Sequence, residues 1–545
     1  MRKESIRYTV FKAWGLGLLL LAGSASAQTQ LDTRAFVPPA DVPLTVRDGV
    51  VELSLSEAVE LALRRNLGLV VERYTRTQAR LGVEQALGAY DPLATIDLQA
   101  SDISRPPTSI TNPTDSNFQQ LTLGVSQFIP TGGQFSLGWQ TSRSETDLAG
   151  DFAFVNPTYN SGLSFTFVQP LLRDFGRGAF ERQLLIAQNQ NLGSNREFSR
   201  QVMTTLQQVI NAYWALVEAR EQLVVARESL GLATELHERN RIQVEVGTMA
   251  QLELVQSEAA IATREEDIIR SQQAVGDSED ALRQLLNLPQ GPLWEAEIRP
   301  ATNPEVSAPT INLVTSIQTA LANRPEIAAQ QLIVEQARIN SVFFRNQKLP
   351  SLDLTLNYGL NGNNGVTVLN NQGTPEIITG GFSDAADQIF GLDFDGWSAQ
   401  LTFGYPIGNR GAKAASTIAD LQLESAETTL AQTEQQVTTE VRRAVRQVES
   451  AAKQIEAAQA SVRFQERSLD AERKRYENGM SSSFEITRIQ QDLTSARSRE
   501  VSAIIAYRTA LTQLQQATGR LLPEYSIVIE DPEEPIERFS LFNRR

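Results

Sequence analysis

The sequence of 545 residues contains no cysteine and a single histidine, His237. Without cysteine the chain can form neither disulfides nor thiolate metal sites, and it has no thiol nucleophile. One histidine excludes sites that need two imidazole ligands. Only six lysines occur, and none stands in the GxxxxGK pattern of a phosphate-binding loop. We therefore predict that the protein is not an enzyme and has no catalytic residues, no cofactor and no metal site; His237 is expected to be a surface residue.

The charge balance limits the choice of partners. Acidic residues outnumber basic ones by 64 to 49, which gives a formal net charge of −15. A protein that grips a phosphate backbone needs a basic face, so nucleic acid is not an expected partner. Past residue 27 the chain also lacks any apolar run of the ~18 residues that a membrane helix needs. The mature chain is either soluble outside the inner membrane or spans a membrane as β-strands.

The N-terminus has the pattern of a secretory signal. Four basic residues in the first twelve precede a short apolar run, Trp14–Ala22, and Ala25-Ser-Ala27 follows it. This order is typical of a signal peptide over residues 1–27, cleaved after Ala27. The alternative is a buried N-terminal helix, which the flanking charges disfavour. No cysteine follows the cleavage position, so that residue cannot carry a lipid anchor.

The remaining chain is an internal duplication. Ala62-Leu63 and Ala320-Leu321 are separated by 258 residues, and the same offset relates Gln78-Ala-Arg80 to Gln336-Ala-Arg338 and Pro92 to Pro350. Later matches have a smaller offset, so the first half contains about 22 additional residues. We divide the chain into an extended segment 28–52, a first repeat 53–288, a proline-rich linker 289–310, a second repeat 311–522 and a tail 523–545.

Each repeat is predicted to contain a helix, strands, a long helix, a turn and another helix. Ser54 or Ser56 can cap a helix that runs to about Tyr90. Alternating strands are expected within about 93–169 and about 351–405, with loops at 102–118, 144–159 and 361–395. The first repeat has four such strands and the second has two. The additional hairpin, about 119–143, either makes six strands per chain or folds outside the membrane.

The long helices favour a membrane channel over an ordinary soluble sheet, which would show the same strand alternation. Two proline-free segments of roughly 68 residues, 178–246 and 411–478, predict helices of about 100 Å. The apolar pairs Val209-Ile210, Leu216-Val217 and Leu223-Val224 recur every seven residues and form a stripe that can touch helices on both sides. The predicted fold class is a mixed membrane protein: a β-barrel continued by a long α-helical coiled-coil barrel, with a tandem repeat.

The sequence resembles the TolC family of outer-membrane efflux and secretion channels. The resemblance is carried by Ala62-Leu-Arg-Arg-Asn66, Ala320-Leu-Ala-Asn-Arg-Pro-Glu326, Gln169-Pro-Leu-Leu172, Gly247-Thr-Met-Ala-Gln-Leu-Glu253 and Tyr476-Glu-Asn-Gly-Met-Ser-Ser-Ser-Phe-Glu485. It implies a homotrimer in the outer membrane whose strands close one barrel and whose helices form a periplasmic tunnel. It also implies three further partners: outer-membrane lipid, a periplasmic adaptor (membrane fusion) protein and an inner-membrane transporter.

Two turns are the expected docking tips. They connect each long helix to the helix that follows, and a glycine just past a helix end can adopt the left-handed cap. The resemblance adds contact with the adaptor. The residues assigned to these tips are Val246, Gly247, Thr248, Met249, Asn478, Gly479, Met480 and Ser481.

The resemblance also places a pore constriction just after the second tip. The position six residues after Gly479 is Glu485, and the next position inward, often Asp in the family, is Arg488 here. Three Glu485 carboxylates would favour cations, while Arg488 could neutralise them or pair across subunits. The alternative for both residues is a solvated helix face. If Glu485 lines the constriction, a Glu485→Ala trimer should conduct better than the unaltered one.

The predicted function is an outer-membrane exit duct of a tripartite efflux or type I secretion system, which conducts passively. The main alternative is a structural or adhesive trimeric coiled coil of the envelope, which would not conduct. An adaptor would carry one helical hairpin between β-rich domains, and an envelope enzyme lacks any residue cluster to support it.

Overall fold

The structure is a computed structural model that describes residues 44–106, 112–147, 155–305, 311–371 and 374–529. The predicted signal peptide, the first part of the 28–52 segment and the last part of the 523–545 tail lie outside these residues. The chain divides into two units, Met1–Thr45 and Val46–Arg545. All helices and strands described below belong to the second unit.

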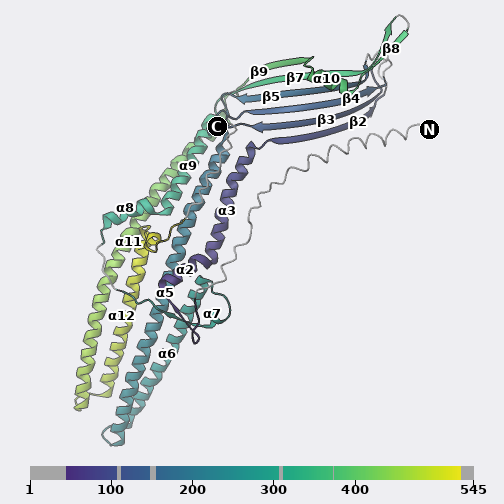
Figure 1. The fold of residues 1–545 in the computed structure, drawn as a ribbon. Helices are drawn as coiled ribbons and strands as arrows, with labels where there is room; N and C mark the ends of the chain where they lie inside the picture. The colour runs from purple at the N-terminus through teal and green to yellow at the C-terminus, as the bar shows by residue number, and fades with distance from the viewer. Residues whose placement is uncertain (1–43, 107–111, 148–154, 306–310, 372–373, 530–545) are drawn as a thin grey trace. The chain divides into compact units, whose positions relative to one another are not determined.

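Two long helices organise the helical part, as Figure 1 shows. α5 (Arg182–Glu245) has 64 residues and α11 (Arg410–Glu477) has 68, so each is about 100 Å long. The shorter helices that pack along α5 are α2 (Leu55–Arg65), α3 (Leu67–Leu87) and α6 (Gln251–Leu286). Those that pack along α11 are α8 (Leu313–Asn323), α9 (Pro325–Asn346) and α12 (Ser483–Ala517). Because α9 and α12 also contact α5, the two halves form one layer of helices.

The first helix of each repeat is broken, which corrects the single helix predicted up to about Tyr90. Ser54 is the residue that caps α2, in a capping box with Glu57, but the helix stops at Asn66. The Asn66 side chain then accepts from the Leu69 amide and donates to the Leu285 carbonyl, 2.9 Å away. In the second repeat the equivalent break falls at Arg324, because Pro325 disfavours a helical residue before it. A short 3-10 turn, Gly88–Tyr90, ends the first segment.

Six long strands form an antiparallel sheet in the order β2-β3-β4-β5-β7-β9. They are β2 (Leu93–Ser104), β3 (Asp115–Phe128), β4 (Gln134–Thr146), β5 (Val155–Pro170), β7 (Ser351–Asn371) and β9 (Asp395–Gly404). The hairpin near 119–143 is thus the β3–β4 pair inside the sheet. Among the six long strands in the described residues, β2 and β9 are the two edges, each with a partner on one side only.

The register divides the sheet into an apolar and a polar face. Residues directly opposite one another on neighbouring strands share a face. One such row is Leu137, Phe165, Tyr358 and Trp397. The next row, one residue earlier on β4, lies on the opposite face and consists of Ser136, Thr166, Asn357 and Ser398. The strand alternation seen in the sequence therefore produces one continuous apolar surface and one continuous polar surface.

The prediction of a long loop at 361–395 is wrong. β7 continues to Asn371 and pairs with the short β8 (Thr374–Thr379), and α10 (Phe382–Phe390) follows. The distal part of β7 is rich in Asn and Gly, which is a loop composition, but its main chain pairs with β5 over 361–365 and with β8 over 366–371. Strands also extend several residues into the two loops expected at 102–118 and 144–159.

The described part of the linker 289–310 contains a short helix and a short strand that the sequence did not predict. These are α7 (Pro292–Glu295) and β6 (Glu297–Pro300), and β6 pairs in parallel with β1 (Val50–Leu53), at the end of the predicted extended segment. The Tyr213 hydroxyl on α5 donates to the Leu53 carbonyl and accepts from the Thr302 amide, both at 3.0 Å. The start of the first repeat and the linker are thereby fixed to the middle of α5.

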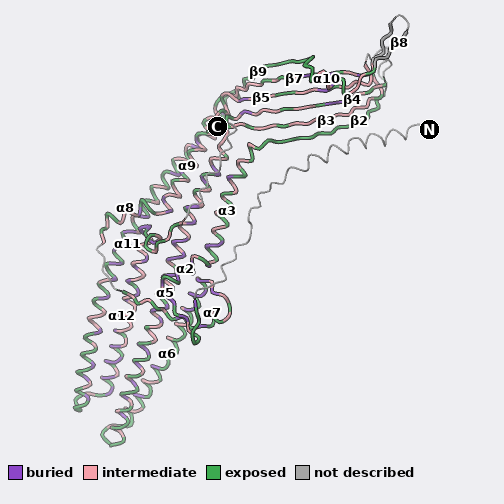
Figure 2. Tube along the Cα trace, in the orientation of Figure 1, coloured by how far each residue is buried: buried purple, intermediate pink, exposed green. Residues whose placement is uncertain are grey.

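The core lies between the helices, whereas most strand residues are half-buried or exposed in this single chain (Figure 2). Val209, Ile210 and Leu216 are fully buried, as their heptad spacing predicts. Val224, from the third predicted pair, is exposed, and Val225 is buried in its place. A straight helix drifts relative to a seven-residue repeat, which accounts for this shift. None of the helices in the described part of the chain is apolar and long enough to cross a membrane.

Candidate functional site at the helical tips

The two turns after the long helices have the same geometry. Gly247 and Gly479 adopt φ of 79° and 70°. The Gly247 amide donates to the Val244 carbonyl and the Thr248 amide to the Gln243 carbonyl, and Gly479 and Met480 repeat both bonds with Tyr476 and Arg475. This is the Schellman motif, which satisfies the last carbonyls of a helix. The turns that sequence reasoning placed at these glycines are therefore left-handed caps at equivalent points of the two repeats.

Large apolar side chains surround both turns and are exposed. Val246 and Met480, predicted as tip residues, are among them. Others were not predicted: Ile242, Leu252, Val255 and Phe484. Their signal in the sequence was a large apolar residue close to the end of one helix or the start of the next. Clustered exposed apolar side chains mark surfaces that bind another protein.

The two tips are connected to each other. The Ser483 hydroxyl at the start of α12 donates to the Glu253 carboxylate at the start of α6, at 2.5 Å. Glu253 and Glu485 hold equivalent positions in the two repeats, each in the first turn of its helix. Glu253 of the first tip therefore holds the second tip, whereas Glu485 of the second tip makes its contact within its own helix, with Arg488.

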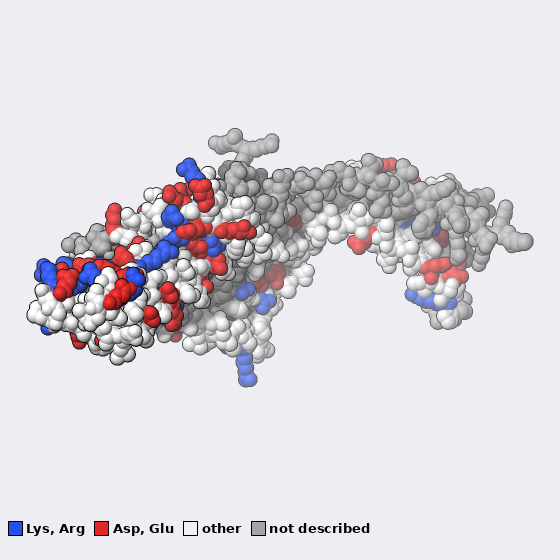
Figure 3. Space-filling model, turned by 90° about the horizontal axis from the view of Figure 1, so that it is seen from below, with Lys and Arg blue, Asp and Glu red and all other residues white. Residues whose placement is uncertain are grey.

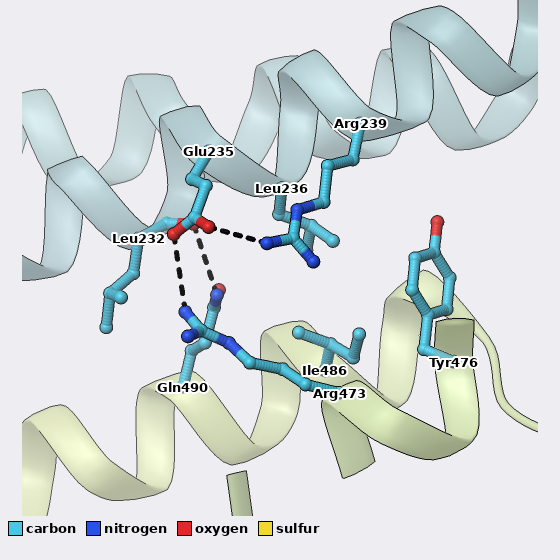
Figure 4. Close-up of a pocket in the computed structure, with 8 residues that line it drawn as sticks. All are labelled: Leu232, Glu235, Leu236, Arg239, Arg473, Tyr476, Ile486 and Gln490. Carbon is cyan, nitrogen blue, oxygen red and sulfur yellow. Dashed lines mark hydrogen bonds and ion pairs between the residues drawn. The ribbon is translucent and has the colours of Figure 1, made fainter. Parts of the chain in front are cut away.

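A polar cluster behind the tips joins α5, α11 and α12 (Figure 4). Glu235 accepts from Arg239 at 2.7 Å and from Arg473 at 3.4 Å. Tyr476 donates to the buried Asn240 at 2.6 Å, and burial, followed by the charge of Glu253, raises the pKa of Tyr476. The cavity between these side chains measures about 10 Å³, which is room for about one water molecule. The cluster holds the three helices together, and its cavity is too small for a substrate.

The predicted constriction residues form a charged stripe on α12. Arg488 donates to the Glu485 carboxylate at 2.8 and 3.0 Å, and its other side lies 3.7 Å from Asp492. The hydrogen bond that Arg488 donates to Glu485, together with the negative charge of that carboxylate, raises the pKa of Arg488. Within one chain, then, Arg488 neutralises part of the charge of Glu485. Asp492 was not predicted, although its spacing of four residues from Arg488 could have identified it.

His237 lies on α5 and is half-buried. Its Nδ1 is 2.9 Å from the Ser257 hydroxyl of α6, so it links the two helices of the first hairpin. Among the described residues there is no group of three His, Asp or Glu side chains that could hold a metal ion. Figure 3 shows acidic and basic side chains interspersed over the helical part. On the face shown, basic and acidic side chains lie side by side, as they do in ion pairs.

The fold and the tips define a class of protein. Long helical hairpins continue a sheet that is apolar on one face, and the hairpins end in exposed apolar turns; an outer-membrane channel has these parts. The model of the outer membrane efflux protein family matches residues 113–288 and 316–520. The chain belongs to this family. The match confirms the resemblance to TolC-type channels, the duplication, and a location in the outer membrane with a periplasmic helical domain.

Solved structures agree on the fold. The chain is similar to the CmeC outer membrane channel of Campylobacter jejuni, with 18% identity, coverage of 86% of each chain and a TM-score of 0.60. It is also similar to the outer membrane protein VceC of Vibrio cholerae, with 16% identity, coverage of 85% of this chain and 96% of that one, and a TM-score of 0.61. It is also similar to the open state of the MtrE channel of Neisseria gonorrhoeae, with 18% identity, coverage of 86% of this chain and 89% of that one, and a TM-score of 0.57. No curated protein matches the sequence.

Proposed function

We propose that three copies of this chain close into one passive duct, which carries substrates delivered by an inner-membrane transporter and an adaptor to the outside. The observation that carries the proposal is the open sheet. In the described chain β2 and β9 each present an unpaired edge, and such edges invite another strand. β2 runs away from the helices and β9 returns to them, so β9 of one copy would meet β2 of the next as an antiparallel partner. Closure of the sheet into a barrel removes both edges.

The two faces of the sheet suit such a barrel. A membrane barrel places its apolar face against lipid and its polar face around the lumen. The row of Leu137, Phe165 and Tyr358 would face lipid, while Ser136, Thr166 and Asn357 would line the duct. With six long strands per chain the complete barrel would contain eighteen, which satisfies the even number of an antiparallel barrel.

The helical layer supports the same assembly. Each chain supplies four columns of helices in the order α6 with α2 and α3, then α5, then α9 with α12, then α11. In the described part of the chain, each outer column contacts another column on one side only. A neighbouring copy would pack against the other side. The exposed apolar tips would then form a ring that docks the adaptor. The chain itself supplies no catalysis, and the energy for export comes from the transporter.

The stripe of Glu485, Arg488 and Asp492 is proposed to line the narrowest part of the closed duct. Each chain contributes two carboxylates and one guanidinium, so the net charge of the stripe is negative. Negative rings at a constriction favour cations. The Arg488 guanidinium moderates this preference, because it is bonded to Glu485.

Conductance and mass together test the function. The purified full-length protein should have the mass of three chains in detergent and should produce discrete conductance steps in a planar bilayer. A Glu485→Ala trimer should conduct better than the unaltered trimer if the stripe lines the constriction. A trimer without conductance would favour the alternative function, a structural or adhesive coiled coil. A monomer that stays in solution without detergent would overturn both.

A further inference from the structure

A short helix covers the apolar face of the sheet at the end remote from the long helices. α10 packs on β5 and β7, with Ala385 and Ile389 buried at 0% and 3% exposure. The Asn363 amide of β7 donates to the Gln388 side chain at 3.0 Å. A Cβ atom on Gly362 would lie 1.9 Å from the Ala385 carbonyl oxygen. Glycine at this position thus allows the helix backbone to touch the strand.

α10 lies on the face that the proposed barrel turns towards lipid. Gly362 is opposite Ser161, and both belong to the alternate set that contains Leu360 and Leu163. The Phe382 ring lies 6.1 Å from Trp139, which is also on that face. Since a neighbouring copy would join in the plane of the sheet at β2 and β9, closure of the barrel would not cover the outer side of α10.

The height of α10 on the sheet corresponds to a membrane boundary. The apolar face begins near the helices at Leu352, which pairs with Phe403, and α10 covers the strand eight to ten residues further on. At ~3.3 Å per residue and a strand tilt of about 40° this is a rise of roughly 20–25 Å. The apolar band of an outer-membrane barrel is about 25 Å tall. α10 therefore lies at the far edge of the band, where aromatic residues gather.

The outer side of this segment exposes large apolar side chains beside the exposed Asp384 and Asp387. Phe390 is 83% exposed, Leu392 is 60% exposed and the nearby Trp397 is 79% exposed. Leu392 also occupies the left-handed position of the cap after α10, with φ of 57°. A branched side chain there is unfavourable, and glycine is the usual choice. Leu392 is not buried against the other described residues in return, which supports a partner outside the described part of the chain.

We infer that α10 and its cap, residues 382–392, anchor the barrel in the outer interface of the membrane, between acyl chains and headgroups. The inference rests on the proposed membrane barrel. An amphipathic helix with large apolar side chains lies in that interface. No Lys or Arg occurs between Lys348 and Arg410, while Asp384, Asp387, Asp393 and Asp395 do. Attachment would therefore come from apolar insertion and would not need anionic lipid.

The absence of cysteine makes the test specific, because one introduced cysteine takes all of a thiol-reactive fluorophore. Trimers with Phe390→Cys, or Ser383→Cys as a second position on α10, are labelled and reconstituted into phosphatidylcholine vesicles. The vesicles carry nitroxides either at the headgroup or at the end of the acyl chain. Leu137→Cys, in the middle of the apolar face, is the membrane control, and Thr248→Cys at the tip is the aqueous control.

On α10, headgroup nitroxides should quench several-fold more than chain-end nitroxides, with the reverse order at Leu137→Cys. Iodide in water should quench only the label at Thr248→Cys strongly. If iodide alone quenches the α10 labels while the lipid nitroxides quench the label at Leu137→Cys, the inferred anchor is wrong and the proposed barrel is retained. If the α10 labels respond to neither, a second copy covers the helix and the inference is overturned. If Leu137→Cys also fails to respond to lipid, the proposed barrel itself fails.

Discussion

The Ser483 hydroxyl lies 2.5 Å from the Glu253 carboxylate and ties the start of α12 to the start of α6, across 230 residues of sequence. Ser483 is buried and Glu253 is half-buried, so this hydrogen bond to a charged acceptor is partly shielded from water. Hydrogen bonds to charged groups contribute about 1.5–3 kcal/mol. The bond joins the two tips that we propose for adaptor docking. We therefore expect it to fix the position of one tip relative to the other.

Ser483→Ala should loosen the two tips from each other. Loss of the bond should raise amide hydrogen exchange in the first turns of α6 and α12, since these turns lose a shared support. Thr487→Ala is the matched control, because the Thr487 hydroxyl bonds only to the Ser483 carbonyl of its own helix. Equal exchange in the Ser483 variant and the control would contradict the proposed tie.

Gly479→Ala should lower stability even though there is open space around the glycine. No heavy atom lies within 4 Å of an added Cβ, but φ is +70°, and a left-handed L-residue costs roughly 1–2 kcal/mol. Gly193→Ala is the control, since Gly193 is inside α5 with equal space and helical backbone. The free energy of unfolding of that variant should rise by about 0.5–1 kcal/mol. Thermal unfolding in detergent measures both, and destabilisation of both variants alike would rule out the backbone explanation.

Glu440→Gln should destabilise the protein at neutral pH and much less in acid. Burial opposes ionisation of Glu440, but hydrogen bonds from Arg324 at 2.5 Å and Gln436 at 3.0 Å lower its pKa below the usual 4.5. A carboxyl with a lowered pKa stabilises the fold above its unfolded pKa, and that contribution disappears as the pH falls through the folded value.

The difference in melting temperature between the unaltered protein and Glu440→Gln should therefore shrink below about pH 4.5. Glu427→Gln, at an exposed position of the same helix, serves as the control. A difference that stays constant from neutral pH into acid would show that the charge of Glu440 is not what stabilises the contact with Arg324.

Arg488→Gln should increase the preference of the duct for cations. The change removes the only positive charge of the Glu485–Arg488–Asp492 stripe, so the negative charge at the proposed constriction grows. Reversal potentials in a salt gradient measure this shift. Arg270→Gln, on the exposed side of α6, should leave the potential unchanged. A shift of the same size in both variants would argue against a constriction at Arg488.

Gly362→Ala should displace α10 from the sheet. The added methyl group would meet the Ala385 carbonyl at 1.9 Å, and overpacking costs about 1–3 kcal/mol. Gly359→Ala is the matched control on the same strand, where the nearest atom would lie 3.9 Å away. Amide exchange across Phe382–Phe390 should rise in the first variant only. Unchanged exchange would mean that the helix accommodates the methyl group by a small shift.

Much of the local structure was predictable because it depends on neighbours in the chain. Ser54 with Glu57 forms a capping box within four residues, and Gly247 and Gly479 follow the long helices at the point where a left-handed residue is needed. The strands were predicted from alternation, which reports burial on one face. The heptad pairs predicted the buried stripe of α5 only until helical drift displaced it near Val224.

What the sequence could not determine rests on contacts between distant residues. β1 pairs with β6, and a break at Asn66 is stabilised by the Leu285 carbonyl, more than 200 positions away. The strand at 361–371 has a loop-like composition and is held by main-chain pairing, and α10 is held by the burial of Ala385 and Ile389 and by the close approach of its backbone to Gly362. Local propensity therefore determined the repeated helices, strands and turns, whereas tertiary contacts decided which tip holds the other and which face of the sheet α10 covers. The energies of such contacts arise only when folding brings the partners together.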